Sequence, residues 1–379
     1  MLDMLGEVCE VFPTMETKLH EWHRANGARM VDFGGWDMPV QYPTGPREEH
    51  VRVREAAGLF DIDHMGRMEI SGPQSEEFLQ RVQTWDVSRL KPGRAHYSMI
   101  LNESGGIMDD IFVYHTPDAW LLVVNASNAP KDFAWLQAQA AGFKVSIRDL
   151  RDDTCLVALQ GPAARGVLQA LGPHEDLDSI GYHHVVERTF AGKCVTLCTT
   201  GYTGEPGCEI LMPSDGCQKT WSAILEAGAP RRLIPCGLAA RDSLRAEACL
   251  PLYGNEIDET TDPLSAGLVR AAVRLEGHEF IGRRALASLA LSSLPRVLVG
   301  FQMKEPGVPR HGYDIARDGK VIGTVTTGLF SPSTGAYIGM GYVEAACSAV
   351  GADVSISIRD AHKAARIVER PFYTSPHWR

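Results

Sequence analysis

The stretch IMDDIFVYHTPDAWLLVVN, residues 107–125, decides the fold class of this chain. Its two halves, 107–114 and 120–125, are rich in Ile, Leu, Val and aromatic residues, and a short polar link separates them. This pattern predicts two antiparallel strands joined as a β-hairpin. Residues 97–101 (YSMIL) also look extended, and the turn residues 103–106 (ESGG) join them to the hairpin.

The sequence before this hairpin predicts two helices and one strand. Residues 44–58 suit a helix with charges on one side, and we expect Gly58 to take the left-handed position at its C-terminus. The alternating stretch 59–70 (LFDIDHMGRMEI) predicts a single strand. The second helix starts at Ser71-Gly72-Pro73, and its apolar face carries Phe78, Leu79 and Val82.

A second unit of similar type follows the hairpin. Strands are predicted over 154–159 and 194–199, with a helix over 161–171 between them. Further helices are expected over about 215–227 and 235–249. Because strands and helices mix without regular βαβ alternation, we predict an α+β fold with mainly antiparallel sheets.

The length of the chain, 379 residues, exceeds what one hydrophobic core usually spans, so we expect two or three domains. Residues 290–295 form a short Ser/Leu linker, and short β-rich runs follow between Gly, Pro and Asp turns. We therefore predict an α+β region over 15–290, a β-rich domain over 291–379, and a flexible leader over 1–14.

The composition argues against several classes of function. Lys and Arg number 37 and Asp and Glu 47, so the formal charge is 37 − 47 = −10, which argues against a broad nucleic-acid surface. No apolar run reaches the roughly 18 residues of a membrane span. The N-terminus carries three acids and no Lys or Arg before residue 13, unlike a signal or transit peptide, so we expect a cytoplasmic protein.

The nine cysteines are scattered without zinc-site spacing, which predicts reduced, buried thiols and no metal. His183 and His184 lack a third ligand, and His64 suits a structural hydrogen bond better than catalysis. No dinucleotide-binding fingerprint occurs, so neither flavin nor nicotinamide is expected.

Asp109 and Asp110 are unusual because they stand inside an otherwise apolar strand. Side chains alternate across a strand, so we expect one carboxylate on each face and at least one of them buried. Such a carboxylate suits a pocket acid or base with a shifted pKa. The alternative is that one of the pair caps the Gly105-Gly106 turn.

Residues 199–210 (TTGYTGEPGCEI) form a glycine-rich segment in which backbone can approach a ligand closely. Tyr202 offers a ring for stacking, and Glu209 can accept two parallel hydrogen bonds from a planar heterocycle. The alternative is an ordinary hairpin turn.

Arg241 and Arg245 lie four residues apart on one face of the predicted helix that contains residues 237–247. They suit a carboxylate ligand or a partner Asp. The alternative is a solvated helix in which Asp242 and Glu247 are their partners.

Taken in order, these motifs resemble the glycine-cleavage T-protein family of aminomethyltransferases. The resemblance covers almost the whole chain after residue 15. It is carried by residues 27–42 (GARMVDFGGWDMPVQY), 56–66 (AAGLFDIDHMG), 97–114, 158–162 (ALQGP), 199–210, 235–259, 280–286 (FIGRRAL) and 323–343.

The resemblance implies a three-lobed, clover-like protein, with two interleaved α+β lobes around a central folate channel and a C-terminal β-barrel or jelly-roll-like lobe. The implied reaction transfers a methylene group from the aminomethyl-dihydrolipoyl arm of a lipoylated H-protein to tetrahydrofolate and releases ammonia. Tetrahydrofolate is then the acceptor substrate, and a monomer or weak dimer is expected.

The resemblance also assigns residues to the site. Asp110 matches the family's key acidic residue near the reactive part of the folate. Positions that contact folate are matched by Tyr97, Tyr202, Glu209 and Arg241. Further candidates are Asn125 and, within residues 371–379, Ser375, His377 and Arg379.

Two departures from the family pattern concern this region. Asp63 stands where Ser is common, and Arg270 stands where an aromatic residue is frequent.

Three other functions remain open. One is a tetrahydrofolate-dependent demethylase of a small methylated substrate. Another is a non-enzymatic folate-binding accessory protein, which typically carries a KGCYxGQE-like motif that Gly201 and Glu205 do not match. The third is a detached folate domain of a flavin-linked sarcosine or dimethylglycine dehydrogenase.

Overall fold

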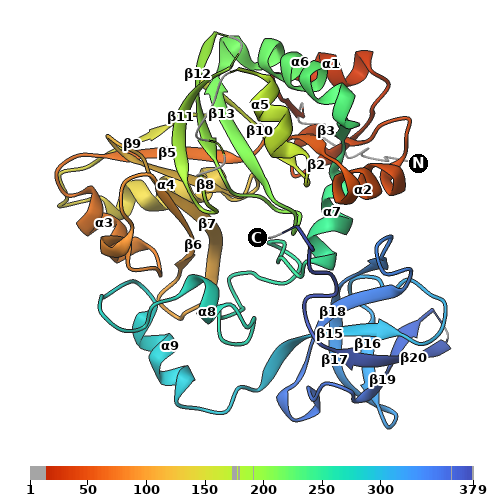
Figure 1. Ribbon diagram of the computed structural model, residues 1–379. Coiled ribbons are helices and arrows are strands. Elements are labelled where there is room, and N and C mark those ends of the chain that lie inside the picture. The colour runs from red at the N-terminus through yellow and green to blue at the C-terminus, as the bar shows by residue number, and fades with distance from the viewer. Residues whose placement is uncertain (1–13, 173–176, 178–179, 191, 360, 378–379) are drawn as a thin grey trace, which may run out of the picture.

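The computed structural model describes residues 14–172, 177, 180–190, 192–359 and 361–377. Three lobes surround the centre of the molecule, which the C-terminal segment reaches (Figure 1). The predicted α+β class and three-lobed arrangement are confirmed. The predicted leader lies outside the described residues except for Thr14, and so does Arg379.

The first lobe is built on a six-stranded sheet with the order β11-β12-β13-β10-β4-β14. Its strands are β4 (Gly58–Asp61), β10 (Thr154–Gln160), β11 (Val185–Phe190), β12 (Lys193–Cys198), β13 (Gly207–Pro213) and β14 (Ile234–Cys236). The helices of this lobe are α1 (His20–Ala25), α2 (Pro46–Glu55), α5 (Ala164–Ala170) and α6 (Cys217–Gly228). Trp221 on α6 is fully buried in the core between the helices and the sheet. A small sheet of β1 (Met15–Glu16), β3 (Trp36–Gln41) and β2 (Arg29–Phe33) lies beside it.

The second lobe is a five-stranded sheet with the order β6-β7-β8-β5-β9. Its strands are β5 (Gly66–Ser71), β6 (Arg94–Leu101), β7 (Ile107–His115), β8 (Trp120–Val124) and β9 (Ser146–Asp149). Helices α3 (Ser75–Val82) and α4 (Ala129–Gln139) supply apolar side chains to its core. The predicted hairpin is confirmed, because β7 and β8 pair antiparallel from Phe112↔Val123 to His115↔Trp120.

The prediction of one strand over 59–70 is wrong. β4 belongs to the first sheet and β5 to the second, with a turn over 62–65 between them. Asp61 Oδ1 accepts from the Asp63 N–H at 2.8 Å, and Ile62 O accepts from the Met65 N–H at 3.1 Å. The alternating pattern continues across this turn, because Phe60 before it, Ile62 at its start, and Met68 and Ile70 after it all stand at even positions, so the sequence conceals the break.

The predicted role of Gly58 is also wrong. Helix α2 ends at Glu55, and Gly58 begins β4 without a positive φ. Its lack of a side chain is needed for packing instead: a Cβ there would lie 2.5 Å from Val53 Cγ2 and 2.7 Å from Cys236 Sγ.

Two smaller expectations also need correction. Helix α7 (Leu238–Glu247) begins three residues later than predicted, because residues 234–236 form β14 at the sheet edge. Cys155 and Cys217 are joined in a disulfide, so the prediction of reduced thiols is wrong for this pair. The other described cysteines are free thiols as expected, but Cys194 is exposed and not buried.

The third lobe is a closed barrel with the order β15-β18-β17-β16-β19-β20. Its strands are β15 (Arg296–Met303), β16 (Asp314–Arg317), β17 (Lys320–Phe330), β18 (Tyr337–Glu344), β19 (Asp353–Ile358) and β20 (Ala361–Val368). Helices α8 (Val269–Ala272) and α9 (Arg283–Ala290) precede it. The domain boundary near residue 290 stays a prediction.

Helix α7 lies between the first lobe and the barrel (Figure 1), and buried charges connect it to both. Arg245 is 1% exposed and donates to Glu256 Oε2 at 2.7 Å and to Thr327 Oγ1 of the barrel at 2.9 Å. Glu247 is fully buried, and it accepts from Arg54 at 2.8 Å and from Ser333 Oγ at 2.7 Å. These bonds link α2, α7 and the barrel.

Replacing Arg245 with Met should therefore destabilise the protein strongly. The change leaves Glu256 buried without its cation, which costs roughly 3–5 kcal/mol. Urea titration and thermal melts measure the loss. Arg232→Met, which breaks an exposed pair with Glu55, is the control and should change stability by about 1 kcal/mol or less. Equal effects of the two substitutions would contradict the role of the buried pair.

Candidate functional site

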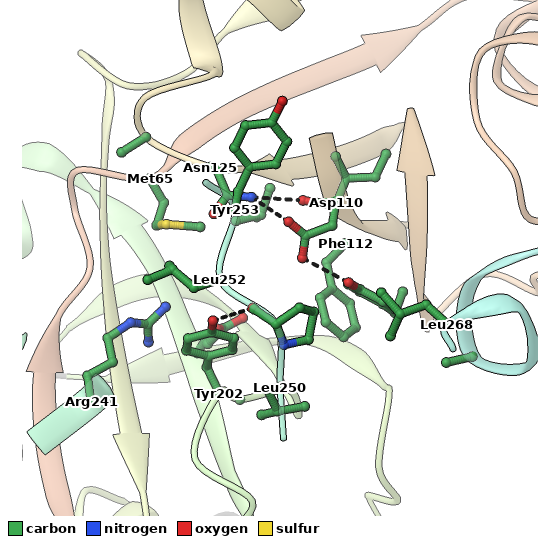
Figure 2. A pocket seen from close by; sticks show the side chains of 18 of the residues that line it. Met65, Asp110, Phe112, Asn125, Tyr202, Arg241, Leu250, Leu252, Tyr253 and Leu268 are labelled. Carbon is green, nitrogen blue, oxygen red and sulfur yellow. Dashed lines mark hydrogen bonds between the residues drawn. The ribbon is translucent and has the colours of Figure 1, made fainter. Parts of the chain in front are cut away.

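A cavity of about 690 Å³ lies among the first two lobes, α7 and the segment 249–255. This volume is typical of small-molecule binding sites. Six predicted site residues line it together (Figure 2 labels four of them): Tyr97, Asp110, Asn125, Tyr202, Glu209 and Arg241. The structure thus brings together residues that stand up to 144 positions apart in the sequence (241 − 97).

Asp110 projects from β7 into the cavity, where two neutral groups hold its carboxylate. Tyr97 OH donates to Oδ2 at 2.9 Å, and Asn125 Nδ2 donates to Oδ1 at 2.7 Å (Figure 2). Burial, and then the nearby Asp109, raise the pKa of Asp110 to about 7 against the opposing effect of the two hydrogen bonds. A carboxyl that titrates near neutral pH can both accept and release a proton.

The predicted alternation of the two aspartates is confirmed. Asp109 points away from the cavity and is fully buried, so the pair does not act as a cap for the Gly105-Gly106 turn. Asp109 accepts the Asn125 backbone N–H at 2.9 Å, Asn125 Nδ2 at 2.8 Å and Asn128 Nδ2 at 2.6 Å. The Asn125 side chain therefore bridges both carboxylates.

Glu209 lies on β13 and faces the cavity from the first lobe. Its Oε2 accepts from Tyr114 OH at 3.0 Å and from Thr200 Oγ1 at 2.7 Å. Both bonds go to Oε2, which leaves Oε1 for a donor in the cavity. A heterocyclic N–H is the kind of donor that fits this position.

Tyr202 and Arg241 form a stacked pair at another wall of the cavity. The guanidinium carbon of Arg241 lies 4.6 Å from the centroid of the Tyr202 ring, and Tyr202 OH donates to Pro251 O. The contact holds the cation over an aromatic face. Arg245, one turn further along α7, is buried and pairs with Glu256 at 2.7 Å and with Asp242 at 2.8 Å. The alternative is therefore right about Asp242 as a partner and wrong about a solvated helix.

His64 also lines the cavity, but not as the hydrogen-bonding residue that we expected. Its buried Nδ1 has no hydrogen-bond partner among the described residues. Burial, and next the positive Arg241, lower the pKa of His64 to about 3, so the ring is neutral at physiological pH.

The two departures from the family pattern have different outcomes. Arg270 lines the cavity. Asp63 does not: its carboxylate is buried against Arg67, with Oδ1 3.0 Å from Nη2.

The C-terminal candidates do not line the cavity where they are described. Ser375 Oγ donates to Glu205 Oε2 at 2.6 Å, and the His377 N–H donates to Ser375 Oγ at 3.1 Å. Neither side chain is among the lining residues. Arg379 lies outside the described part of the chain.

Several functional residues were missed by the sequence analysis. Phe112 lines the cavity, and Tyr114 donates a hydrogen bond to Glu209. Both lie on the face of β7 that carries Asp110. The two-residue periodicity of the strand could have identified them. His96, His183 and Tyr182 also line the cavity, and no sequence signal pointed to them as ligand contacts.

Within the described ranges, no group of three or more His, Cys, Asp or Glu side chains has the geometry to hold a metal ion. None of the helices described is long and apolar enough to cross a membrane.

Comparison with known proteins assigns the family. The GCVT N-terminal domain matches residues 19–276, and the glycine cleavage T-protein C-terminal barrel domain matches residues 296–374. The chain is 46% identical to the aminomethyltransferase of Symbiobacterium thermophilum, over 96% of this chain and 98% of that protein. It is 41% identical to the aminomethyltransferase of Bacillus subtilis, over 94% and 98%.

A solved structure agrees with these relatives. The glycine cleavage system aminomethyltransferase T from Bartonella henselae superposes with a TM-score of 0.90 at 35% identity, covering 96% of this chain and 99% of that chain. The chain therefore belongs to the glycine cleavage T-protein family. Within that family it is an aminomethyltransferase, a transferase of the glycine cleavage system.

The raised pKa of Asp110 predicts that Asp110→Asn stabilises the protein at high pH. The folded state holds this proton up to a pKa of about 7, whereas an unfolded Asp loses it near 4. Wild-type stability should therefore fall as pH rises from about 4 to about 7, and the penalty persists above that range. Asp110→Asn should therefore raise the free energy of unfolding by up to about 4 kcal/mol at pH ~8 and by little at pH ~4.

Urea titrations of both proteins at the two pH values measure this difference. A gain of equal size at both pH values, or no gain at the higher one, would contradict the assigned titration of Asp110.

Proposed function

We propose that this aminomethyltransferase transfers a methylene group from the aminomethyl-dihydrolipoyl arm of a lipoylated H-protein to tetrahydrofolate bound in the cavity. The observation that carries the proposal is Asp110, a buried carboxyl that faces the cavity, titrates near neutral pH and has only neutral hydrogen-bond donors. The cytoplasmic location and the monomer or weak dimer expected from the sequence stay predictions.

The proposed reaction balances without a redox partner. The C–S bond and the C–N bond of the aminomethyl-sulfur group break, and two new C–N bonds to the folate form. Tetrahydrofolate gives up two N–H protons, of which one goes to the departing sulfur and the other to the departing amine as ammonia. The products are 5,10-methylenetetrahydrofolate, the free dihydrolipoyl arm and ammonia.

Asp110 serves this reaction as the acceptor for a proton on an attacking folate nitrogen. The same carboxylate stabilises the positive charge that develops on that nitrogen. Tyr97 and Asn125 orient Asp110, because each donates to a different oxygen of the carboxylate. The ionised form is the active one, so turnover should rise with pH through the pKa of Asp110.

The remaining residues bind the folate in this proposal. Glu209 accepts from the pterin N–H groups through its remaining oxygen, and the rings of Tyr97 and Tyr202 line the ligand. Arg241 pairs with an acidic group of the ligand from its position over Tyr202.

The decisive experiment measures ammonia release and methylenetetrahydrofolate formation from aminomethylated H-protein. Wild-type enzyme should form both products in equal amounts, and Asp110→Asn should lower kcat by roughly 100-fold or more, the scale of general acid–base catalysis. Asp118→Asn, which changes an exposed acid in the loop of the same hairpin, is the matched control and should keep wild-type turnover. Turnover with methylated small molecules, and none with H-protein, would favour the demethylase alternative instead.

Glu209→Ala should weaken tetrahydrofolate binding by about 10-fold or more, because a charge-assisted hydrogen bond contributes roughly 1.5–3 kcal/mol. Isothermal titration calorimetry measures the affinity. Glu187→Ala, an exposed acid on β11 of the same sheet, should leave it unchanged. Unchanged affinity in Glu209→Ala would remove this residue from the ligand site.

A further inference from the structure

A third carboxyl group, that of Asp132, lies behind Asp110 and Asp109 and is fully buried. It stands in the first turn of α4, four residues after Asn128, which donates to Asp109. Among the described residues, only the Asp109 carboxyl, when protonated, could donate a hydrogen bond to either oxygen of Asp132. The Asp132 carboxyl faces that of Asp109, close enough for the two to form a hydrogen bond once one of them carries a proton.

A hydrogen bond between two carboxyl groups requires a proton on one of them. Three N–H groups donate to Asp109, and donors of this kind stabilise the ionised form. Asp132 lacks such donors, and its burial without them favours the neutral acid. The proton therefore belongs on Asp132, and the negative charge belongs on Asp109.

We propose that Asp132 is a positioning residue that shares a single proton with Asp109 and so keeps one fixed negative charge directly behind Asp110. The Asn125 side chain transmits the arrangement to the cavity, because the same amide donates to Asp109 Oδ1 and to Asp110 Oδ1. Asp132 touches no ligand; it acts through Asp109. The consequence for the reaction rests on the proposed role of Asp110, whereas the shared proton does not.

Burial raises the pKa of Asp109, but hydrogen bonds from Asp132, Asn128 and Asn125 oppose that rise, whereas the interaction with Asp109 raises the pKa of Asp132. Burial, and then the Asp109 charge, raise the pKa of Asp132 to about 10, and burial with the same charge raises the pKa of Asp110 to about 7. Lys131, the neighbouring cation on α4, lowers the pKa of Asp132 but does not reverse the rise. Its Nζ is bonded to Glu259 at 2.7 Å and to Met108 O at 2.9 Å.

Apart from the Asn125 and Asn128 amides, the other groups that face the three carboxyls are neutral hydroxyls. Tyr97 on β6 donates to Asp110. The phenols of Tyr202 and Tyr253 lie close enough for Asp110 and Asp109, respectively, to raise their pKa values. None of these groups supplies a positive charge to the pair.

The first test is infrared spectroscopy of the full-length protein at pH ~8, between the pKa values of Asp110 (about 7) and Asp132 (about 10). The carbonyl band of a buried protonated carboxyl should be present in the wild type, shift in D₂O, and persist in Asp110→Asn. It should be lost in Asp132→Asn. No band in the wild type, or the same band in Asp132→Asn, would overturn the proposal. This readout needs neither folate nor turnover.

The second test is the pH profile of kcat. Asp109→Asn removes the charge behind Asp110, so the acidic limb should move down by about one pH unit, a tenfold change in proton concentration. Asp132→Asn keeps a neutral donor to Asp109, so its limb should stay at the wild-type position. A shift in Asp132→Asn as large as that in Asp109→Asn would overturn the proposal.

Leu136→Val is the matched control for looser packing of α4. Leu136 is fully buried one turn after Asp132 and carries no charge, so the acidic limb of the kcat profile should not move in Leu136→Val. If Asp110→Asn keeps full turnover, the proposed role of Asp110 fails, while the infrared band still decides whether Asp132 holds the proton.

Discussion

Buried charge has to be compensated inside the protein, and in this chain that requirement fixes helix α7. Arg245 and Glu247 on this helix are at most 1% exposed, and their charged partners are Glu256 and Arg54. An uncompensated charge at such depth costs several kcal/mol, whereas a packed pair roughly balances its own desolvation. The partners come from α2 and from the segment after α7, and the barrel adds hydroxyl donors, so the first lobe and the barrel meet at this helix. The same helix carries Arg241 to the cavity.

The opposite arrangement occurs at the cavity, where a carboxylate on β7 lacks an oppositely charged partner in the described part of the chain. Among the described residues, Asp110 has no ion pair with a Lys or Arg, only hydrogen bonds from Tyr97 and Asn125. Each such bond is worth about 1–3 kcal/mol to a charged acceptor, which does not offset the desolvation of a buried carboxylate. The pKa therefore rises to about 7. An Arg beside Asp110 would stabilise the fold but would hold the carboxylate ionised and paired, unable to take a proton from a ligand.

How much of this could be read from the sequence depends on whether a feature is local. The β7–β8 hairpin and the opposite faces of Asp109 and Asp110 follow from two-residue periodicity, and both predictions were confirmed. The break between β4 and β5 was missed because the alternation runs on through the turn. The direction of Arg245 was missed because its partners, Glu256 and Thr327, stand 11 and 82 residues further along the chain. The ligand and the reaction came from family resemblance and not from residue pattern.

Asp132 shows why a carboxyl can be invisible to such patterns and still set the chemistry of the site. An acid in the first turn of a helix normally suggests a favourable interaction with the helix dipole, worth about 0.3–1 kcal/mol in its ionised form. Burial without a donor opposes ionisation by several kcal/mol, and the anion on Asp109 adds to that opposition. The cost of burying the ionised form exceeds the gain from the helix dipole, so Asp132 keeps its proton. Burial has the largest effect on the proton affinity of Asp110, and the charge on Asp109 adds to it from a face of the sheet that the ligand never contacts.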